Sequence, residues 1–280
     1  MSEKKLSILI ANFNNGHFFK DCYNSLVAQT DSRWEAIIID DDSTDDSVNV
    51  IKAIIKDDNR FKFYKNEINL GYQSTIEKAI TLTETNYFGR LDPDDALTEN
   101  AIEECLKAHE KFPDVGLVYS NHFICDENLQ IIKINKGAQI ADKIFFNGEV
   151  LSFASFKKNI YLKTSGIDAK NKRAEDKDIY LKMSEVAPVK HIDSALYLYR
   201  IHQGGVSSTN DRIDKSYFWY WVAIIKAAER RQENVEDEFL KKFVRRHKYK
   251  EIITNIDLLK KNRWIKLGAK LGLVKIFKNL

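Results

Sequence analysis

Two groups of acidic residues in this chain have the composition and spacing of a divalent-cation site. Residues 40–42 read Asp-Asp-Asp and residues 92–95 read Asp-Pro-Asp-Asp, each directly after an apolar run. Two carboxylates about 4 Å apart repel by roughly 4 kcal/mol at an effective dielectric near 20, so a crowded group must be solvated, protonated or neutralised by a cation. Such oxygen ligands favour Mg²⁺ or Mn²⁺. Two solvated turns are the alternative, since Asp-Pro-Asp suits a type I turn.

The elements that carry these groups read as alternating strands and helices. Strands are expected over residues 6–11, 34–40, 61–65 and 87–91, and helices over 17–29, 44–57 and 72–84. We expect Ser43 to cap the second of these helices. Continuous apolar strands between helices predict a mainly parallel sheet covered on both faces, whose carboxyl edge binds ligands. Both acidic groups should therefore lie at that edge.

The second half of the chain continues the pattern with less regularity. A helix is expected over 99–111, strands over 115–124, 151–156 and 196–201, a further helix over 175–186, and helix from about 210 onward. Residues 1–208 therefore form the predicted α/β domain, and residues 209–280 a helical, basic extension.

Composition places the chain among ordinary globular proteins. Of 280 residues, 44% are apolar and 30% charged, with only 11 Gly and 3 Pro. Cys22, Cys105 and Cys125 show no paired spacing, which indicates a reducing compartment and no zinc site. The apolar stretch after the N-terminus is too short for a signal peptide, and the longest apolar run, 217–225, is too short to span a bilayer. A cytoplasmic location is expected.

The net charge of +3 conceals a strong asymmetry. Residues 241–280 hold 13 Lys and Arg against Glu251 and Asp257, a local +11, so the rest of the chain carries −8. An acidic body is a poor nucleic-acid surface, whereas the basic tail suits an anionic membrane face. A solvated helix or a dimer-forming helix is the alternative for the tail. The aromatic run 217–221 is interpreted as core packing, with sugar stacking or an interfacial belt as alternatives.

No phosphate-binding glycine loop of the GxxxxGK or GxGxxG type occurs, which leaves a diphosphate held chiefly by metal. The motifs that remain resemble family 2 glycosyltransferases of the GT-A fold over residues 6 to about 208. They are Ala11-Asn12-Phe13-Asn14, Asp40-Asp41-Asp42-Ser43, Asn69-Leu70-Gly71, Leu91-Asp92-Pro93-Asp94-Asp95, Glu175-Asp176, and Arg200-Ile201-His202 with Ser207. Asn12 and Asp42 depart from the usual family residues at their positions.

The resemblance implies a role for each matched position. Donor nucleotide contacts are implied for Ala11, Asn12, Phe13, Asn14 and Asp40, with Asp40 accepting from the uracil N–H. Asn69 and Gly71 resemble the loop over the nucleotide, and Asp92 the residue near the donor ribose or sugar. Asp94 matches the metal ligand, His202 a histidine near that metal, and Asp176 the catalytic base.

The implied activity is a metal-dependent inverting glycosyltransferase that uses Mn²⁺ or Mg²⁺ and a nucleotide sugar, expected to be a UDP-sugar. The acceptor implied is a glycan or lipid-linked saccharide in surface polysaccharide assembly, at the inner face of the membrane. One base suffices for direct displacement, and the metal stabilises the leaving diphosphate. Arg200 suits either a phosphate or an acidic surface partner. A nucleotidyltransferase and a non-catalytic nucleotide-sugar-binding scaffold are the rival functions.

Overall fold

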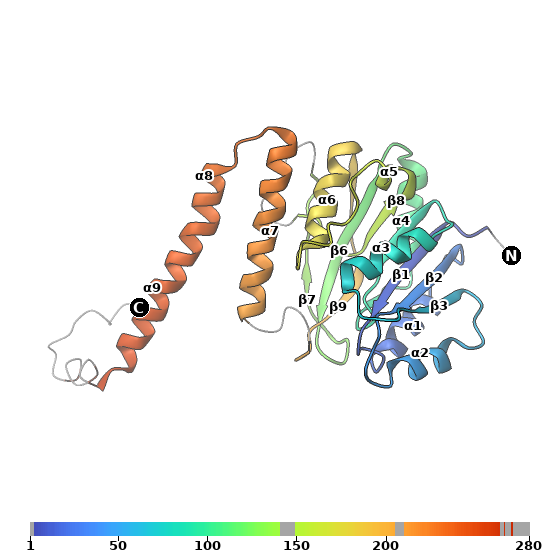
Figure 1. Cartoon of the computed structure of the whole chain (residues 1–280), viewed down its shortest axis with the longest axis horizontal. Coiled ribbons are helices and arrows are strands. Elements are labelled where there is room, and N and C mark those ends of the chain that lie inside the picture. The colour runs from blue at the N-terminus through green and yellow to red at the C-terminus, as the bar shows by residue number, and fades with distance from the viewer. Residues whose placement is uncertain (1–2, 141–148, 205–209, 264–265, 267–269, 271–280) are drawn as a thin grey trace. The chain divides into compact units, whose positions relative to one another are not determined.

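The computed structural model describes residues 3–140, 149–204, 210–263, 266 and 270. Contacts between Cα atoms divide the chain into two compact units, Met1–Ala227 and Ala228–Leu280 (Figure 1). Ser207, which the motif reading included, lies outside the described residues, as does most of the chain after residue 263.

The first unit is built on one mixed sheet with the strand order β3-β2-β1-β4-β8-β6-β9-β5, and β7 pairs with β6. Strands β3, β2, β1 and β4 are parallel to one another, as predicted, while β8 runs antiparallel between β4 and β6. The strands are β1 (Leu6–Asn12), β2 (Trp34–Asp40), β3 (Phe61–Lys65), β4 (Tyr87–Arg90), β5 (Ala96–Leu97), β6 (Leu117–Cys125), β7 (Ile131–Asn135), β8 (Ala154–Lys157) and β9 (Val189–Arg200). The predicted α/β architecture is confirmed.

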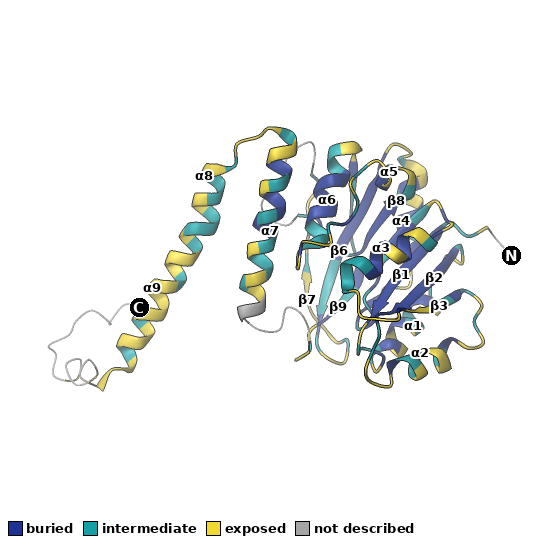
Figure 2. Ribbon diagram, in the orientation of Figure 1, coloured by how far each residue is buried: buried dark blue, intermediate teal, exposed yellow. Residues whose placement is uncertain are grey.

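Helices cover both faces of this sheet, so β1 and β2 are buried along their whole lengths (Figure 2). One face of β1 packs with α1, α2 and α4 into a continuous hydrophobic core, and α3 contacts β1 and β2 separately. The helices of this unit are α1 (Phe19–Val27), α2 (Ser47–Ile55), α3 (Tyr72–Leu82), α4 (Ala101–Lys111), α5 (Lys158–Tyr161), α6 (Glu175–Val186) and most of α7 (Asn210–Arg231). Burial on two faces explains why these strands lack polar alternation.

Ser43 does not cap the second helix, which corrects the sequence-based expectation. Helix α2 begins at Ser47, and Asp46 occupies its N-cap position. The Ser43 hydroxyl instead donates to Asp40 Oδ2 at 2.6 Å. A charged carboxylate accepts a stronger hydrogen bond than a neutral group does. The Ser43 hydroxyl therefore binds Asp40 at the end of β2 and does not cap α2.

The first unit extends beyond residue 208, the boundary expected from the sequence. Tyr220 and Trp221 on α7 are buried, which confirms core packing for these two members of the aromatic run, and Ile224 one turn further on is buried with them. Phe218, another member of the run, is half exposed and does not belong to the core. Apolar burial therefore attaches the first part of α7 to the sheet domain.

The second unit consists of the end of α7 followed by α8 (Glu236–Glu238), the π-helix η1 (Phe239–Val244) and α9 (Arg245–Lys261). None of these last three elements contains a buried residue, and their apolar side chains are partly or fully exposed (Figure 2). Across the described part of the chain, no helix has the length and hydropathy needed to cross a membrane.

His109 predicts an acid-dependent loss of stability in the first unit. Its side chain is 2% exposed, contacts Ser155 Oγ at 3.0 Å through Nε2 and stacks on Tyr87. Burial, with a smaller effect from Lys157, lowers the pKa of His109 to about 3. Because the unfolded chain takes up this proton near pH 6.5 and the folded chain does not, stability falls as the pH drops from 6.5 towards 3.

Between pH 7 and pH 4.5 we expect His109 to account for a loss of roughly 2–3 kcal/mol in the free energy of unfolding. Urea denaturation of the parent and of His109→Gln at both pH values isolates this contribution, because the other titrating groups are common to the two proteins. The variant should lose less stability on acidification. Equal losses in both proteins would show that His109 titrates normally in the folded state.

Candidate active site

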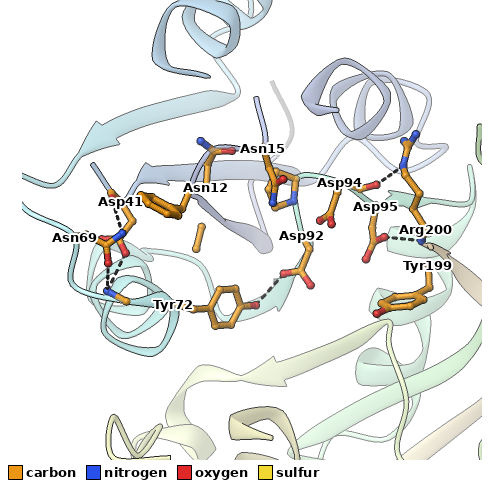
Figure 3. A pocket seen from close by; sticks show the side chains of 14 residues that line it. Asn12, Asn15, Asp41, Asn69, Tyr72, Asp92, Asp94, Asp95, Tyr199 and Arg200 are labelled. Carbon is orange, nitrogen blue, oxygen red and sulfur yellow. Dashed lines mark hydrogen bonds between the residues drawn. The ribbon is translucent and has the colours of Figure 1, made fainter. Parts of the chain in front are cut away.

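A cavity of about 350 Å³ opens at the carboxyl edge of the parallel strands, where the two acidic groups were expected to meet. Residues after β1, β2 and β4 contribute to one shared wall (Figure 3). The lining residues are Ala11, Asn12, Phe13, Asn15, Asp41, Asn69, Gly71, Tyr72, Asp92, Pro93, Asp94, Asp95, Tyr199 and Arg200. The parallel register of β1 with β2 and β4 brings these loops together.

Asp40 and Asp41 occupy different environments. Asp40 is fully buried and accepts hydrogen bonds from Asn12 Nδ2 at 2.8 Å and from the Ser43 backbone N–H at 2.9 Å. It does not line the cavity, whereas Asp41 does. Asp40 therefore holds Asn12 at the cavity wall instead of facing the cavity itself.

Asn14 does not line the cavity either. Its Oδ1 accepts from the Thr44 backbone N–H at 2.9 Å, and its own backbone N–H donates to Ser43 Oγ at 3.0 Å. Its neighbour Asn15 lines the cavity in its place. Asn14 thus joins the loop after β1 to the loop after β2.

The loop with Asn69 and Gly71 is organised by the Asp41 carboxylate. Asp41 Oδ1 accepts from the Leu70 backbone N–H at 2.9 Å and Oδ2 from the Gly71 backbone N–H at 2.8 Å, while Asn69 Nδ2 donates to the Asp41 carbonyl at 3.0 Å (Figure 3). Gly71 has φ +83°, which a side chain would disfavour. Asp41 therefore fixes the conformation of the loop 69–71 where it lines the cavity.

Residues 92–95 after β4, here called the acidic turn, place three carboxylates in the lining of the cavity. Asp92 Oδ1 accepts from the Tyr72 hydroxyl at 2.9 Å, and Asp95 Oδ2 accepts from the Tyr197 hydroxyl at 2.6 Å. Burial and the charge of Asp94 raise the pKa of Asp92 to about 6 and raise that of Asp95 as well. The hydrogen bonds do not offset the repulsion among these carboxylates, so a bound cation would stabilise the turn.

Asp94 and His202 lie side by side at this turn. Asp94 Oδ2 lies 2.9 Å from His202 Nε2, although the two residues are far apart in sequence. The described residues contain no cluster of three or more His, Cys, Asp or Glu side chains suited to a metal. One carboxylate and one imidazole fit Mg²⁺ or Mn²⁺, because such ions are commonly held by few protein ligands together with water and substrate phosphates.

Arg200 directs its side chain into the protein. Nε donates to the Asp94 carbonyl at 2.6 Å, Nη1 to the Glu127 carbonyl at 2.6 Å and Nη2 to Asp21 Oδ2 at 2.8 Å. The acidic partner expected as one possibility from the sequence is Asp21, and Arg200 also lines the cavity. Arg200 therefore anchors the end of β9 beside the acidic turn, which keeps His202 close to Asp94.

Asp176 lies in the first turn of α6, where Oδ1 accepts from the Lys177 backbone N–H at 2.8 Å. It does not line the cavity. Its charge nevertheless contributes to the raised pKa of Asp92 and is the second cause, after burial, of the pKa of about 7 at Glu175. Asp176 is thus electrostatically coupled to the acidic turn.

Six lining residues were not assigned a role from the sequence: Asn15, Asp41, Tyr72, Pro93, Asp95 and Tyr199. Asp41, Pro93 and Asp95 belong to the family motifs named from the sequence, so the sequence alone could have placed these three in the site. Tyr72 follows Gly71 directly, but only its contact with Asp92 marks it as part of the site. Tyr199 carries no comparable motif signal.

A protein-family model matches this chain. The model described as glycosyl transferase family 2 matches residues 7–165, more than half of the chain. The chain is 28% identical to chondroitin synthase of Escherichia coli over 268 residues, covering 94% of this chain and 36% of that protein. It is also 28% identical to hyaluronan synthase of Pasteurella multocida, covering 72% of this chain and 21% of the relative. The chain thus spans about a third or less of these relatives.

Two solved structures show the same fold at low sequence identity. The S. aureus TarS fragment 1–349 in complex with UDP aligns with a TM-score of 0.62 at 16% identity, covering 79% of this chain and 65% of that one. The mannosyltransferase PcManGT from Pyrobaculum calidifontis, in complex with GDP-Man and Mn²⁺, aligns with a TM-score of 0.61 at 11% identity, covering 81% and 65%.

Proposed function

The chain belongs to glycosyl transferase family 2, and on that premise we propose that it transfers a sugar from a nucleotide sugar to a hydroxyl of a glycan or lipid-linked saccharide. The observation that carries this proposal is the cavity into which Asp41, Asp92 and Asp94 converge. We propose a UDP-sugar as the donor and surface polysaccharide assembly as the setting. The UDP held by TarS and the polymers named for the chondroitin and hyaluronan synthases support both choices.

The donor nucleotide would lie between the loop after β1 and the loop 69–71. Asn12 and Phe13 from the first loop and Asn69 and Gly71 from the second all line the cavity. Phe13 is 46% exposed, so its ring is available to contact a base. Asp40 contributes through Asn12, which it holds by a hydrogen bond, and Asp41 takes the position at the cavity surface.

Asp94 and His202 are the residues that would hold the divalent cation. When bound, that ion neutralises the negative charge that develops on the leaving diphosphate. The chain itself keeps Asp94 Oδ2 and His202 Nε2 close together, because Arg200 anchors the end of β9 to the acidic turn. Asp92, held by Tyr72, lies within the same wall and is suited to accept a hydrogen bond from a donor hydroxyl.

Asp176 is the proposed base for the acceptor. A hydroxyl is a poor nucleophile, and a carboxylate within hydrogen-bond reach takes its proton as attack proceeds. Attack on the sugar from the side opposite the leaving group inverts the anomeric centre, so no second carboxylate has to form a covalent intermediate. The location of Asp176 outside the nucleotide cavity suits an acceptor that approaches from the side of α6.

A panel assay tests the proposal. The whole chain is incubated with Mn²⁺ and UDP- or GDP-linked sugars, with acceptor saccharides added, and released nucleoside diphosphate and pyrophosphate are both recorded. Release of UDP or GDP together with a glycosylated product supports a glycosyltransferase. Pyrophosphate release would favour a nucleotidyltransferase, and nucleotide-sugar binding with no product would favour the non-catalytic scaffold.

Contact of the basic C-terminal segment with an anionic membrane is part of the same proposal. Tyr249, Ile252, Ile256 and Leu259 recur on α9 at spacings of three and four residues and form one apolar stripe. Tyr249, Ile252 and Leu259 are 65%, 55% and 46% exposed. Residues 239–263 carry nine Lys and Arg against Glu251 and Asp257. This charge opposes pairing of two such helices and favours anionic lipid, with the stripe at the acyl boundary.

The stripe gives a direct test of membrane contact. Ile252→Glu should reduce co-sedimentation with phosphatidylglycerol–phosphatidylcholine vesicles by about tenfold, because burial of a large aliphatic side chain contributes roughly 1.5–3 kcal/mol. Thr254→Glu introduces the same charge on the polar side of α9, where Thr254 is exposed, and should change binding less. Equal losses in the two variants, failure of the parent to bind, or a stable dimer disrupted by Ile252→Glu would contradict the proposal.

A further inference from the structure

A charged pair joins the sheet to the helix that carries the proposed base. Arg90 is the last residue of β4, and Glu175 is the first residue of α6. Arg90 Nη1 lies 3.6 Å from Glu175 Oε1, and the side chains are only 12% and 17% exposed. Neither residue lines the nucleotide cavity. The pair therefore lies behind the site, between two of the elements that form it.

Arg90 is poorly satisfied by hydrogen bonds for a buried arginine. Its Nε and Nη1 atoms have no hydrogen-bond partner among the described residues, and its guanidinium lies 5.9 Å from the centre of the Tyr72 ring. Buried ion pairs of this kind contribute little net stability, since the cost of removing both charges from water offsets their attraction. Packing alone therefore gives no reason for an arginine at this position.

The first turn of α6 has another anchor in Lys177, whose Nζ donates to the Val150 carbonyl at 2.6 Å, but the turn begins in a strained conformation. Its N-cap residue Ala174 makes no side-chain capping bond and has φ +54°, a conformation that costs an alanine roughly 1–2 kcal/mol. Glu175 and Asp176 are adjacent carboxylates, and their repulsion contributes to the raised pKa of Glu175. A positive charge beside them offsets this repulsion. Arg90 supplies that positive charge.

Each residue of the pair is close in sequence to a carboxylate of the proposed site. Arg90 comes two residues before Asp92, and Glu175 comes one residue before Asp176. We propose that the Arg90–Glu175 pair is a positioning device that holds the first turn of α6, and with it Asp176, at a set place relative to the acidic turn. This inference rests on the proposed transferase function, in which Asp176 serves the acceptor and the acidic turn serves the donor.

Isosteric substitution of Glu175 tests the positioning role of the pair. Glu175→Gln should leave the KM for the nucleotide sugar and the affinity for UDP with Mn²⁺ within about threefold, and lower kcat on the order of 10- to 100-fold, because small misplacement of a reacting group has effects of that size. Glu185→Gln, the same change near the other end of α6, is the matched control and should leave kcat unchanged.

Arg90 variants test whether the effect belongs to the pair. Arg90→Met should lower kcat as Glu175→Gln does, Arg90→Lys should restore part of the loss, and the double variant should lose no more than the larger single loss. Additive losses would overturn the inference. So would a loss in Glu175→Gln equal to that of Asp176→Asn while Arg90→Met stays active, because Glu175 would then itself act as the base.

Amide hydrogen exchange provides a readout that does not depend on turnover. Glu175→Gln should speed exchange in a peptide covering the first turn of α6 and leave α3 and α4 unchanged. If the parent chain transfers no sugar but this exchange difference is present, the proposed function fails and the positioning role survives. Unchanged exchange in the first turn would overturn the positioning role whatever the activity. Because Glu175→Gln keeps the side-chain shape, the test stands even if Arg90→Met does not fold.

Discussion

Asp176→Asn is expected to abolish sugar transfer while the protein still folds and binds UDP with Mn²⁺. The amide has the size of the carboxylate and can still accept from the Lys177 backbone N–H, so the first turn of α6 should persist. It cannot take a proton from the acceptor hydroxyl. Because general-base catalysis typically contributes 10²- to 10⁴-fold, the rate of nucleoside diphosphate release with acceptor present should fall by roughly that factor.

Rate measurements and calorimetry on the same preparation check this expectation. Asp237→Asn, the same substitution in the first turn of α8, serves as the control, since that residue is exposed and lies in the second unit. Full turnover by Asp176→Asn would remove the residue from the role of base. Loss of UDP binding as well would indicate that the substitution disturbs the donor site and not the proton transfer alone.

Asp94→Ala is expected to have the second large effect, on nucleotide binding. In the parent, Mn²⁺ should strengthen UDP binding, because the ion would bridge the protein and the diphosphate. Asp94 and His202 are the two residues that would hold it, so loss of the carboxylate should weaken metal-dependent binding by about 100-fold, the upper end of the 10- to 100-fold loss typical of removing a residue that only supports a ligand. Without Mn²⁺, parent and variant should bind UDP with similar, low affinity.

Titration calorimetry with UDP, in the presence and absence of Mn²⁺, measures the difference directly. Asp42→Ala is a suitable control because Asp42 is a partly exposed carboxylate at the end of another strand, paired with Lys65 at 3.2 Å. It should bind UDP as the parent does. A variant at Asp94 whose affinity responds to Mn²⁺ as strongly as the parent's would refute the assignment of Asp94 as a metal ligand.

The two effects should be separable because they act at different places. Asp94 lies in the wall of the nucleotide cavity, whereas Asp176 lies outside it on α6. Donor affinity should therefore depend on Asp94 and not on Asp176, while the rate of transfer should depend on both. The Arg90–Glu175 pair would be the structural link between these places.

The strands of the first half could be predicted from the sequence almost to the residue, whereas the helix bounds differ by up to three residues. Strands β2 and β3 have the predicted bounds, and β1 and β4 differ by one residue. Most side chains in these strands are apolar, and turn residues or charges bound each run. For β1 and β2, which are buried on both faces, burial alone selects such residue types.

Other strands could not be predicted because their formation depends on partners. Strand β5 has two residues and exists through its pairing with β9, and β7 is an exposed strand paired with β6. Strand β9 begins at Val189, seven residues before the expected start, since its polar first half pairs with β6. Where neither apolar periodicity nor turn residues mark a segment, only the neighbouring strand decides its conformation.

The sequence by itself determined that two acidic groups would meet, because parallel strands end at one sheet edge and both groups follow such strands. It also determined the family, through short motifs in a set order. Only the tertiary structure decided which carboxylates face the cavity. Asp40 does not line it and accepts hydrogen bonds from Asn12 and Ser43, whereas Asp41 lines it and accepts from the loop 69–71. Adjacent side chains on an extended chain point to opposite sides, so hydrogen-bond partners distant in sequence choose between them.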